Sequence, residues 1–256
     1  MFENKEFYID KDGFKIHAKL DFPEMTETPE KLPVVILVHG FTGNMEEKHI
    51  VAVAKAARQA DMATLRVEMY GHGKSDGTFE NHNILDWISI MLYVIDYARK
   101  LPFAGDIYLC GHSQGGLLTI LAGALKADQL KAIIPLSAAI SIRDDCRGGI
   151  VFGKGFDLAH IPDGVTIPGG KVVSGNYIRT ASVLPVEAAI DAFTKPVLLI
   201  HGTADDTVPV TCSMQAARRY RNAKLVLVPD DTHCYDHHLE IVTQAVTEFL
   251  KEQNAI

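Results

Sequence analysis

The sequence predicts an α/β protein with a mostly parallel central sheet flanked by helices. Short apolar runs typical of buried strands alternate along the chain with longer segments of helical pattern. This alternation favours parallel strands joined by helices that cover both faces of the sheet. A serine between two glycines also stands directly where one strand run gives way to a helical pattern. Such a sheet carries its sites at the carboxyl ends of its strands.

Length and composition favour one globular domain over residues 1–256, although 256 residues would also suffice for two small domains. The content of 47% hydrophobic and 22% charged residues is ordinary for a globular protein. The net charge is −7, and no basic stripe is present. We therefore expect no nucleic-acid partner.

Targeting and redox signals point to the cytoplasm. Residues 1–6 show no apolar leader core, and no run approaches 18 apolar residues, so we expect neither a secretory leader nor a membrane span. The cysteines lack C-x-x-C spacing, which favours reduced thiols over disulfides or a zinc site. The oligomeric state is not determined, and a homodimer stays open. The four cysteines are Cys110, Cys146, Cys212 and Cys234.

The predicted elements follow in order along the chain. An alternating pattern over residues 2–22, centred on Asp12-Gly13, predicts an N-terminal hairpin. Buried strands are expected at Val34–Val38, Ala63–Val67, Ile107–Cys110, Ala132–Leu136, Val197–Ile200 and Leu225–Val228. Helices are expected at residues 46–60, 82–100, 114–126, 209–221 and 236–251.

Residues 140–185, which we call the inserted segment, interrupt the alternation of predicted strands and helices. Glycine becomes dense there, strands and helices stop alternating, and Val165–Val173 has the pattern of a small hairpin. A structureless loop of this length is improbable in a compact domain. We expect a cap subdomain over the carboxyl edge of the sheet. The alternative is a surface excursion without a role in binding.

The stretch Gly111-His112-Ser113-Gln114-Gly115 predicts a nucleophile elbow. It follows the apolar run Asp106–Cys110 and opens a helical segment rich in Leu, Ala and Gly. In this turn the serine adopts strained dihedral angles, and the glycines avoid collisions where strand and helix cross. Ser113 is therefore the candidate catalytic nucleophile.

A serine hydroxyl needs a base, and the base needs an orienting acid. In this architecture the acid and then the histidine follow the serine along the chain. His233 comes after the last predicted strand, and Asp205 and Asp206 come after the preceding one. We favour Asp205, because Asp206 is expected to face outward or to cap the next helix. A structural role for Asp205 in its loop is the alternative.

The oxyanion of an acyl intermediate requires two backbone N–H donors. Gln114 N–H stands directly after the serine at a helix N-terminus. Phe41 N–H, in the loop His39–Asn44, is the candidate for the second donor, and an ordinary glycine turn is the alternative. Most of the eleven histidines are expected to have no role in the site, and His39 and His201 are expected to shape loops by hydrogen bonding. No ligand set predicts a metal, and no cofactor is required.

These motifs together resemble the α/β-hydrolase superfamily over nearly the whole chain. The resemblance rests on His39-Gly40-Phe41, Gly71–Ser75, the elbow and His201–Asp205 with Val208-Pro209. In that family the acid stands three residues beyond the glycine of H-G-x-x-D, which corresponds to Asp205. The scaffold alone leaves the substrate open, because it hosts lipases, peptidases and lactonases.

His-Gly-Phe-Thr-Gly, the elbow and the inserted segment are also similar to those of bacterial cinnamoyl (feruloyl) esterases. That resemblance implies a serine carboxylic ester hydrolase that acts on hydroxycinnamate esters through an acyl-enzyme. It also implies that the inserted segment covers the acyl pocket. Asp145 and Tyr177 are the candidate ligands of the phenolic hydroxyl, with Asp144 as a near alternative to Asp145. An exposed charge and a packed tyrosine are the plain alternatives.

Three other functions fit the same motifs. The first is an esterase for short aliphatic or monoacylglycerol esters, and the second is an oligopeptidase-like acyl hydrolase. The third is a ligand receptor that keeps the fold without turnover. The expected partner in the preferred interpretation is a small-molecule ester.

Overall fold

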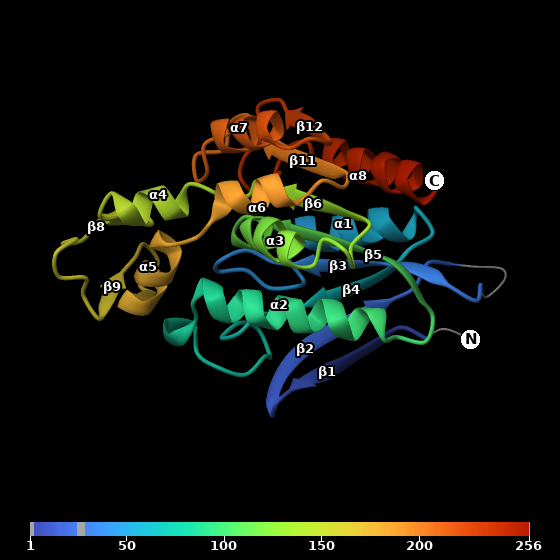
Figure 1. Ribbon diagram of the computed structural model, residues 1–256, viewed down its shortest axis with the longest axis horizontal. Helices are drawn as coiled ribbons and strands as arrows, with labels where there is room; N and C mark the ends of the chain where they lie inside the picture. Colours follow the sequence, from blue (N-terminus) through green and yellow to red (C-terminus); the bar gives the residue numbers. More distant parts are fainter. Residues whose placement is uncertain (1–2, 25–28, 256) are drawn as a thin grey trace.

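The structure is a computed structural model that describes residues 3–24 and 29–255; Met1 and Phe2, part of the stretch inspected for a leader, lie outside the described residues. Eight strands form one sheet in the order β1-β2-β4-β3-β5-β6-β11-β12 (Figure 1). The pairs β1–β2 and β2–β4 are antiparallel and the others are parallel, which confirms the predicted fold class. The strands are β1 (Lys5–Lys11), β2 (Phe14–Asp21), β3 (Leu32–Val38), β4 (Ala63–Val67), β5 (Ala104–His112), β6 (Ala132–Leu136), β11 (Val197–Gly202) and β12 (Ala223–Val228).

Helices cover both faces of this sheet. Successive side chains of β3 point to opposite faces of the sheet and pack in two separate hydrophobic cores. Val34, Ile36 and Val38 lie in the core that includes residues of α2 and α3. Val35 and Leu37 lie in the core that includes residues of α1 and α8. No helix within the described ranges is long and apolar enough to cross a membrane. The helices are α1 (Lys48–Arg58), η1 (Phe79–Asn81), α2 (Ile84–Arg99), α3 (Gln114–Leu125), α6 (Val186–Ala192), α7 (Thr211–Arg219) and α8 (Leu239–Asn254).

The predicted helices all occur, but their ends shift. The last helix begins at Leu239, three residues later than expected, and continues to Asn254. The helix α6 was not predicted, because seven residues give less than two full periods of the helical pattern.

The inserted segment is structured along much of its length. Its elements are α4 (Ile142–Arg147), β7 (Ile150–Val151), β8 (Lys154–Gly155), β9 (Gly164–Thr166), β10 (Val172–Ser174) and α5 (Gly175–Ser182). The predicted hairpin is present as β9–β10. In Figure 1 these elements project together from one end of the sheet, on the left. Their short helices explain why the sequence showed no periodic signal there.

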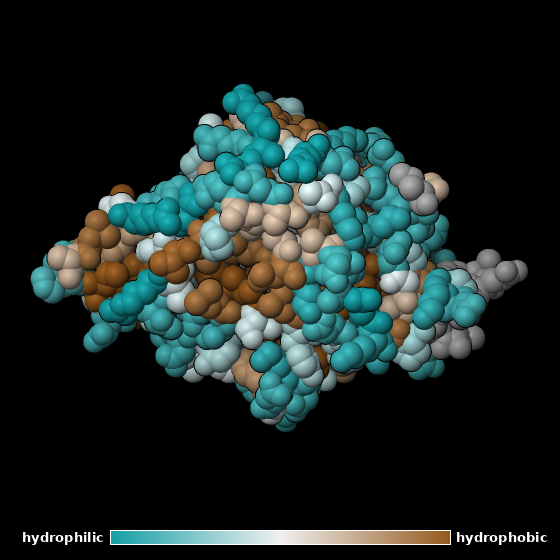
Figure 2. All heavy atoms as spheres, in the orientation of Figure 1, coloured by the Kyte–Doolittle hydropathy of each residue, from teal (hydrophilic) through white to brown (hydrophobic). Residues whose placement is uncertain are grey.

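The face formed by α2, α3 and α6 carries an apolar area at its centre. Figure 2 shows this area over α3, between α2 and α6. The residues of α3 are almost all Leu, Ala, Gly or Ile, so this helix is apolar around most of its circumference. Its last residue, Leu125, is 63% exposed.

The turn from β5 into α3 admits no side chain at its two glycines. A Cβ atom at Gly111 would lie 2.2 Å from the Gly115 carbonyl oxygen, and a Cβ atom at Gly115 would lie 2.4 Å from the His39 carbonyl oxygen. Between them, Ser113 has φ 58° and ψ −118°. The strained serine and the close crossing expected from the sequence are therefore both present.

We expect Gly111→Ala to destabilise the fold by about 1–3 kcal/mol, because the methyl group must displace backbone rather than a flexible side chain. Urea unfolding followed by circular dichroism would measure this. Gly105→Ala in the same strand is the matched control, since its Cβ atom would meet nothing closer than 3.5 Å. Equal stability of the two variants would contradict the account.

Candidate active site

A cavity of about 610 Å³ opens at the carboxyl ends of the central strands. Its volume is within the range of small-molecule sites. Six of the seven site residues singled out in the sequence line it, together with part of the inserted segment. From the candidate site these are Phe41, Ser113, Gln114, Asp145, Tyr177 and His233, with Asp205 held directly behind His233.

The elbow presents Ser113 at the floor of this cavity. Its N–H donates to the Leu136 carbonyl at 2.9 Å, and its carbonyl accepts from the N–H groups of Leu117 and Ala139, both at 3.0 Å. These bonds join the elbow to the end of β6 and to the first turn of α3. The serine is consequently held from both sides, and only 8% of its surface is exposed.

Asp205 and His233 form a direct pair. His233 Nδ1 lies 2.7 Å from Asp205 Oδ2, although the residues come from the loops after β11 and β12. The other carboxylate oxygen accepts the N–H groups of Thr207 at 2.9 Å and Val208 at 2.8 Å. His201 Nε2 lies 3.1 Å from Asp205 Oδ2. The carboxylate is therefore fixed by four donors, and its side chain is fully buried.

These contacts set the charge of Asp205. Burial by itself favours the neutral acid, but the hydrogen bonds from His201, His233 and Val208 outweigh it and hold the pKa of Asp205 below its ordinary value. Its neighbour Asp206 is exposed and accepts only the Thr207 hydroxyl, at 3.2 Å, among the contacts of the described residues. Of the two aspartates that the sequence offered, Asp205 is the one that reaches His233.

His112, inside the elbow motif, is bonded to the loop of His233. Its Nε2–H donates to the His233 carbonyl at 2.7 Å, and its ring lies 4.1 Å from that of His49. Burial lowers the pKa of His112 well below its usual value, so the ring is a neutral donor. No sequence pattern indicates this bond, because it joins residues 121 positions apart.

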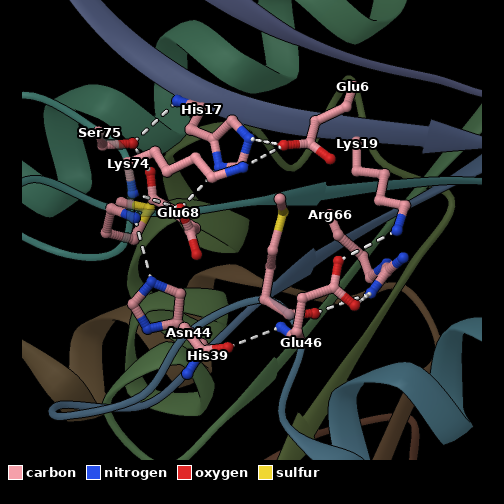
Figure 3. Close-up of polar contacts among 12 residues, drawn as sticks. Glu6, His17, Lys19, His39, Asn44, Glu46, Arg66, Glu68, Lys74 and Ser75 are labelled. Carbon is pink, nitrogen blue, oxygen red and sulfur yellow. Dashed lines mark hydrogen bonds and ion pairs between the residues drawn. The ribbon is translucent and has the colours of Figure 1, made fainter.

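The loop after β3 lies directly against the elbow. A Cβ atom at Gly40 would lie 3.1 Å from the Ser113 Cβ atom. His39 Nδ1–H donates to the Gly40 carbonyl at 2.8 Å. Its Nε2 accepts the Met69 N–H at 3.1 Å, the dashed line at His39 in Figure 3. Burial lowers the pKa of His39 to about 3, so this ring is also neutral.

The next peptide of this loop is bound as well. His72 Nε2 lies 2.5 Å from the Phe41 carbonyl oxygen, and its Nδ1 lies 2.9 Å from the Tyr70 carbonyl oxygen. Because the carbonyl of Gly40 and the N–H of Phe41 belong to one peptide unit, the bond from His39 also fixes the direction of the Phe41 N–H. The prediction that His39 shapes its loop by hydrogen bonding is confirmed.

Polar networks support these loops from the side of β1 and β2. His17 Nδ1 lies 2.6 Å from Glu68 Oε2, which also accepts the Lys74 N–H at 2.7 Å, and His17 Nε2 lies 2.8 Å from Glu6 Oε1 (Figure 3). In the same view Lys19 of β2 donates to Glu46 at 3.2 Å. The N-terminal hairpin is thereby bonded to the segments that follow β3 and β4.

The cavity wall toward the inserted segment is aromatic. Phe41 stacks on Phe152 with ring centres 3.9 Å apart, and it meets Phe79 at 5.1 Å and Tyr177 at 5.6 Å in edge contacts. Phe152 has a φ of 45° at the turn between β7 and β8. The sequence reasoning missed Phe152, since a lone phenylalanine in a glycine-rich segment carries no motif.

The two candidate substrate ligands of the inserted segment lie on the cavity in different surroundings. Tyr177 is 1% exposed and its hydroxyl donates to Gln114 Oε1 at 2.7 Å. Asp145 is exposed, while partial burial still raises its pKa. The near alternative Asp144 binds Arg143 at 2.8 Å instead. The described residues include no group of three or more His, Cys, Asp or Glu placed to hold a metal ion.

Comparison with known proteins agrees with this geometry. Residues 29–160 match the family model for serine aminopeptidases, S33, and residues 173–255 match that for TAP-like proteins. Among curated relatives, the rat mitochondrial palmitoyl-protein thioesterase ABHD10 is 25% identical over 194 residues, which are 74% of this chain and 64% of the rat protein. A thermostable monoacylglycerol lipase of Bacillus sp. is 26% identical over 184 residues, or 68% of this chain and 71% of the lipase.

A solved structure gives a stronger likeness. Est1E from Butyrivibrio proteoclasticus, with ferulic acid bound, is 51% identical and superposes with a TM-score of 0.95. The match covers 98% of this chain and 100% of Est1E. The family match over half of the chain, together with this full-length likeness, shows that the chain belongs to the α/β-hydrolase superfamily and is a carboxylic ester hydrolase.

Proposed function

We propose that this protein hydrolyses hydroxycinnamate esters through an acyl-enzyme formed on Ser113. The observation that carries the proposal is the 2.7 Å pair of His233 and Asp205, on a cavity that Ser113 shares with an aromatic wall. Nucleophile, base and orienting acid are the three parts that serine acyl transfer requires.

In the first step the Ser113 hydroxyl attacks the ester carbonyl while His233 accepts its proton. Asp205 keeps the imidazole in the tautomer that has its free nitrogen toward the serine, and its charge stabilises the imidazolium. His233 then gives this proton to the oxygen of the leaving alcohol. In the second step a water molecule, activated by His233, releases the carboxylic acid and regenerates Ser113. No metal or organic cofactor takes part.

Two backbone donors bind the oxyanion in this proposal. Gln114 N–H lies at the N-terminus of α3, where the helix dipole favours negative charge. Phe41 N–H belongs to the peptide that His39 fixes through the Gly40 carbonyl. Donors held before the reaction need no reorganisation when charge develops, which is why such groups contribute strongly to catalysis.

An aromatic acyl group fits the wall formed by Phe41, Phe152 and Tyr177. The ferulic acid bound to Est1E, half of whose residues are identical to this chain, supports the same choice. Asp145 and Tyr177 are the proposed ligands of the phenolic hydroxyl, and the inserted segment acts as the cap over the acyl pocket. The four cysteines are all described and form no disulfide, which supports action in the reducing cytoplasm.

Replacing Ser113 by Ala should lower kcat for methyl ferulate by at least about 10³-fold, because no nucleophile remains. Thermal unfolding should be nearly unchanged. Steady-state hydrolysis and a melting curve measure both, and fluorophosphonate labelling of the wild type alone provides an independent check. Ester hydrolysis by the variant near the wild-type rate would reject the mechanism.

Asp205→Asn should lower kcat by roughly 10³–10⁴-fold, since the amide no longer holds the imidazole in its productive tautomer. Asp230→Asn is the matched control, because Asp230 is exposed and its carboxylate is no part of the proposed machinery. Similar losses in the two variants would show that the loops, rather than the Asp205 carboxylate, limit catalysis.

A substrate panel separates aromatic from aliphatic acyl preference. We expect kcat/KM for methyl ferulate to exceed that for methyl butyrate, with the aromatic wall as the reason. Tyr177→Phe should reduce kcat/KM for methyl ferulate about three- to tenfold more than for methyl cinnamate, which lacks the phenolic hydroxyl. A preference for butyrate or for long-chain monoacylglycerols would favour the aliphatic alternative instead.

A further inference from the structure

The half of the cavity beside His233 differs in chemistry from the aromatic half. It is lined by polar side chains from the loops after β3 and β11, namely Thr42, Glu47, Asp206 and Thr207. In the mechanism above, the leaving oxygen takes its proton from His233. The alcohol portion of the ester must therefore occupy this half while the acyl group occupies the other.

Glu47 lies at the N-terminal end of α1 with its carboxylate folded against the loop. A Cβ atom at Gly43 would lie 2.2 Å from Glu47 Oε2, so the carboxylate fills the space that this glycine leaves. That oxygen is buried and has no hydrogen-bond partner among the described residues; the nearest cation-forming group, His49 Nε2, is 3.8 Å away. Burial raises the pKa of Glu47, and a hydrogen bond from the Asn44 backbone partly opposes this shift.

Asp206 supplies a second carboxylate on the same half. It is exposed, and its one described partner is the Thr207 hydroxyl at 3.2 Å. No lysine or arginine is found among the described residues that line the cavity. Ionised carboxylates only accept hydrogen bonds, so this wall offers acceptors and negative charge without a compensating cation.

We infer that Glu47 and Asp206 form a leaving-group subsite that selects an uncharged alcohol bearing several hydroxyl groups and disfavours an anionic alcohol. Hydroxyl groups on the alcohol can donate to the carboxylate oxygens that face the cavity. A carboxylate or phosphate on the alcohol would instead be repelled by like charge. The inference rests on the proposed ester hydrolysis and extends it to the other half of the substrate.

The test compares two esters of the same acid. Chlorogenate carries a free carboxylate on its alcohol portion, and its methyl ester has the same caffeoyl group and hydroxyls without that charge. We expect wild-type kcat/KM for methyl chlorogenate to exceed that for chlorogenate by about three- to tenfold at low salt, from like-charge repulsion across a partly solvated site. About 0.5 M NaCl should reduce this ratio by screening.

The variants assign the effect to residues. Glu47→Gln and Asp206→Asn should each move the ratio toward one, and the double variant should do so most. Glu252→Gln, which removes an exposed carboxylate on α8, is the matched control and should retain the wild-type ratio. Because Asp206 is exposed, we expect Asp206→Asn to fold. It therefore reports the change in the kcat/KM ratio even if Glu47→Gln does not fold.

Hydroxyl recognition has a separate readout. The ratio of kcat/KM for methyl chlorogenate to that for methyl caffeate should fall at least about threefold in Glu47→Ala, the loss expected for one hydrogen bond. If the wild type hydrolyses methyl caffeate but both kcat/KM ratios are near one, the subsite is overturned and the proposed function is not. The same holds if neither ratio changes in any of the variants. Absence of methyl caffeate turnover would overturn the proposed function and the subsite with it.

Discussion

The close crossing of β5, α3 and the loop after β3 is the constraint on which the site depends. Gly111 and Gly115 leave no room for a Cβ atom, and Gly40 lies against the Ser113 Cβ atom. The absence of side chains at these glycines therefore lets three segments pack in direct contact. They are the backbone that carries Ser113, the N-terminus of α3 and the loop with Phe41. Any side chain at these glycines would separate the nucleophile from the donors proposed for the oxyanion.

Buried neutral histidines complete what this packing begins. His39 and His112 each donate to a backbone carbonyl of a loop that carries a candidate site residue, and His72 lies between the carbonyl oxygens of Phe41 and Tyr70. Burial keeps all three pKa values low, so each ring retains one donor and one acceptor nitrogen rather than a charge. Loops of irregular shape thus acquire fixed peptide orientations without a cation being buried behind the active site.

The cavity divides the two halves of an ester between two kinds of surface. On one side, the inserted segment brings Phe152 and Tyr177 against Phe41, which offers stacking and an apolar surrounding. On the other side, Glu47 and Asp206 offer acceptors and negative charge. His233 lines the same cavity, and in the proposed mechanism it gives its proton to the leaving alcohol. The scaffold is common to many hydrolases, so we assign the proposed selectivity to these walls rather than to the triad.

The sequence by itself determined the sheet, most of its helices, the elbow and the positions of Ser113 and His233. These features depend on the local periodicity of apolar residues and on steric constraints between residues close in the chain. Both can be recognised in the sequence without a structure. The sequence also favoured Asp205 over Asp206, and the structure places Asp205 against His233. Tertiary structure alone decided that His112 holds the His233 loop and that Glu47 lines the cavity. Those contacts join irregular loops distant in the chain, and the direction of a loop side chain follows from the packing around it, which no local pattern encodes.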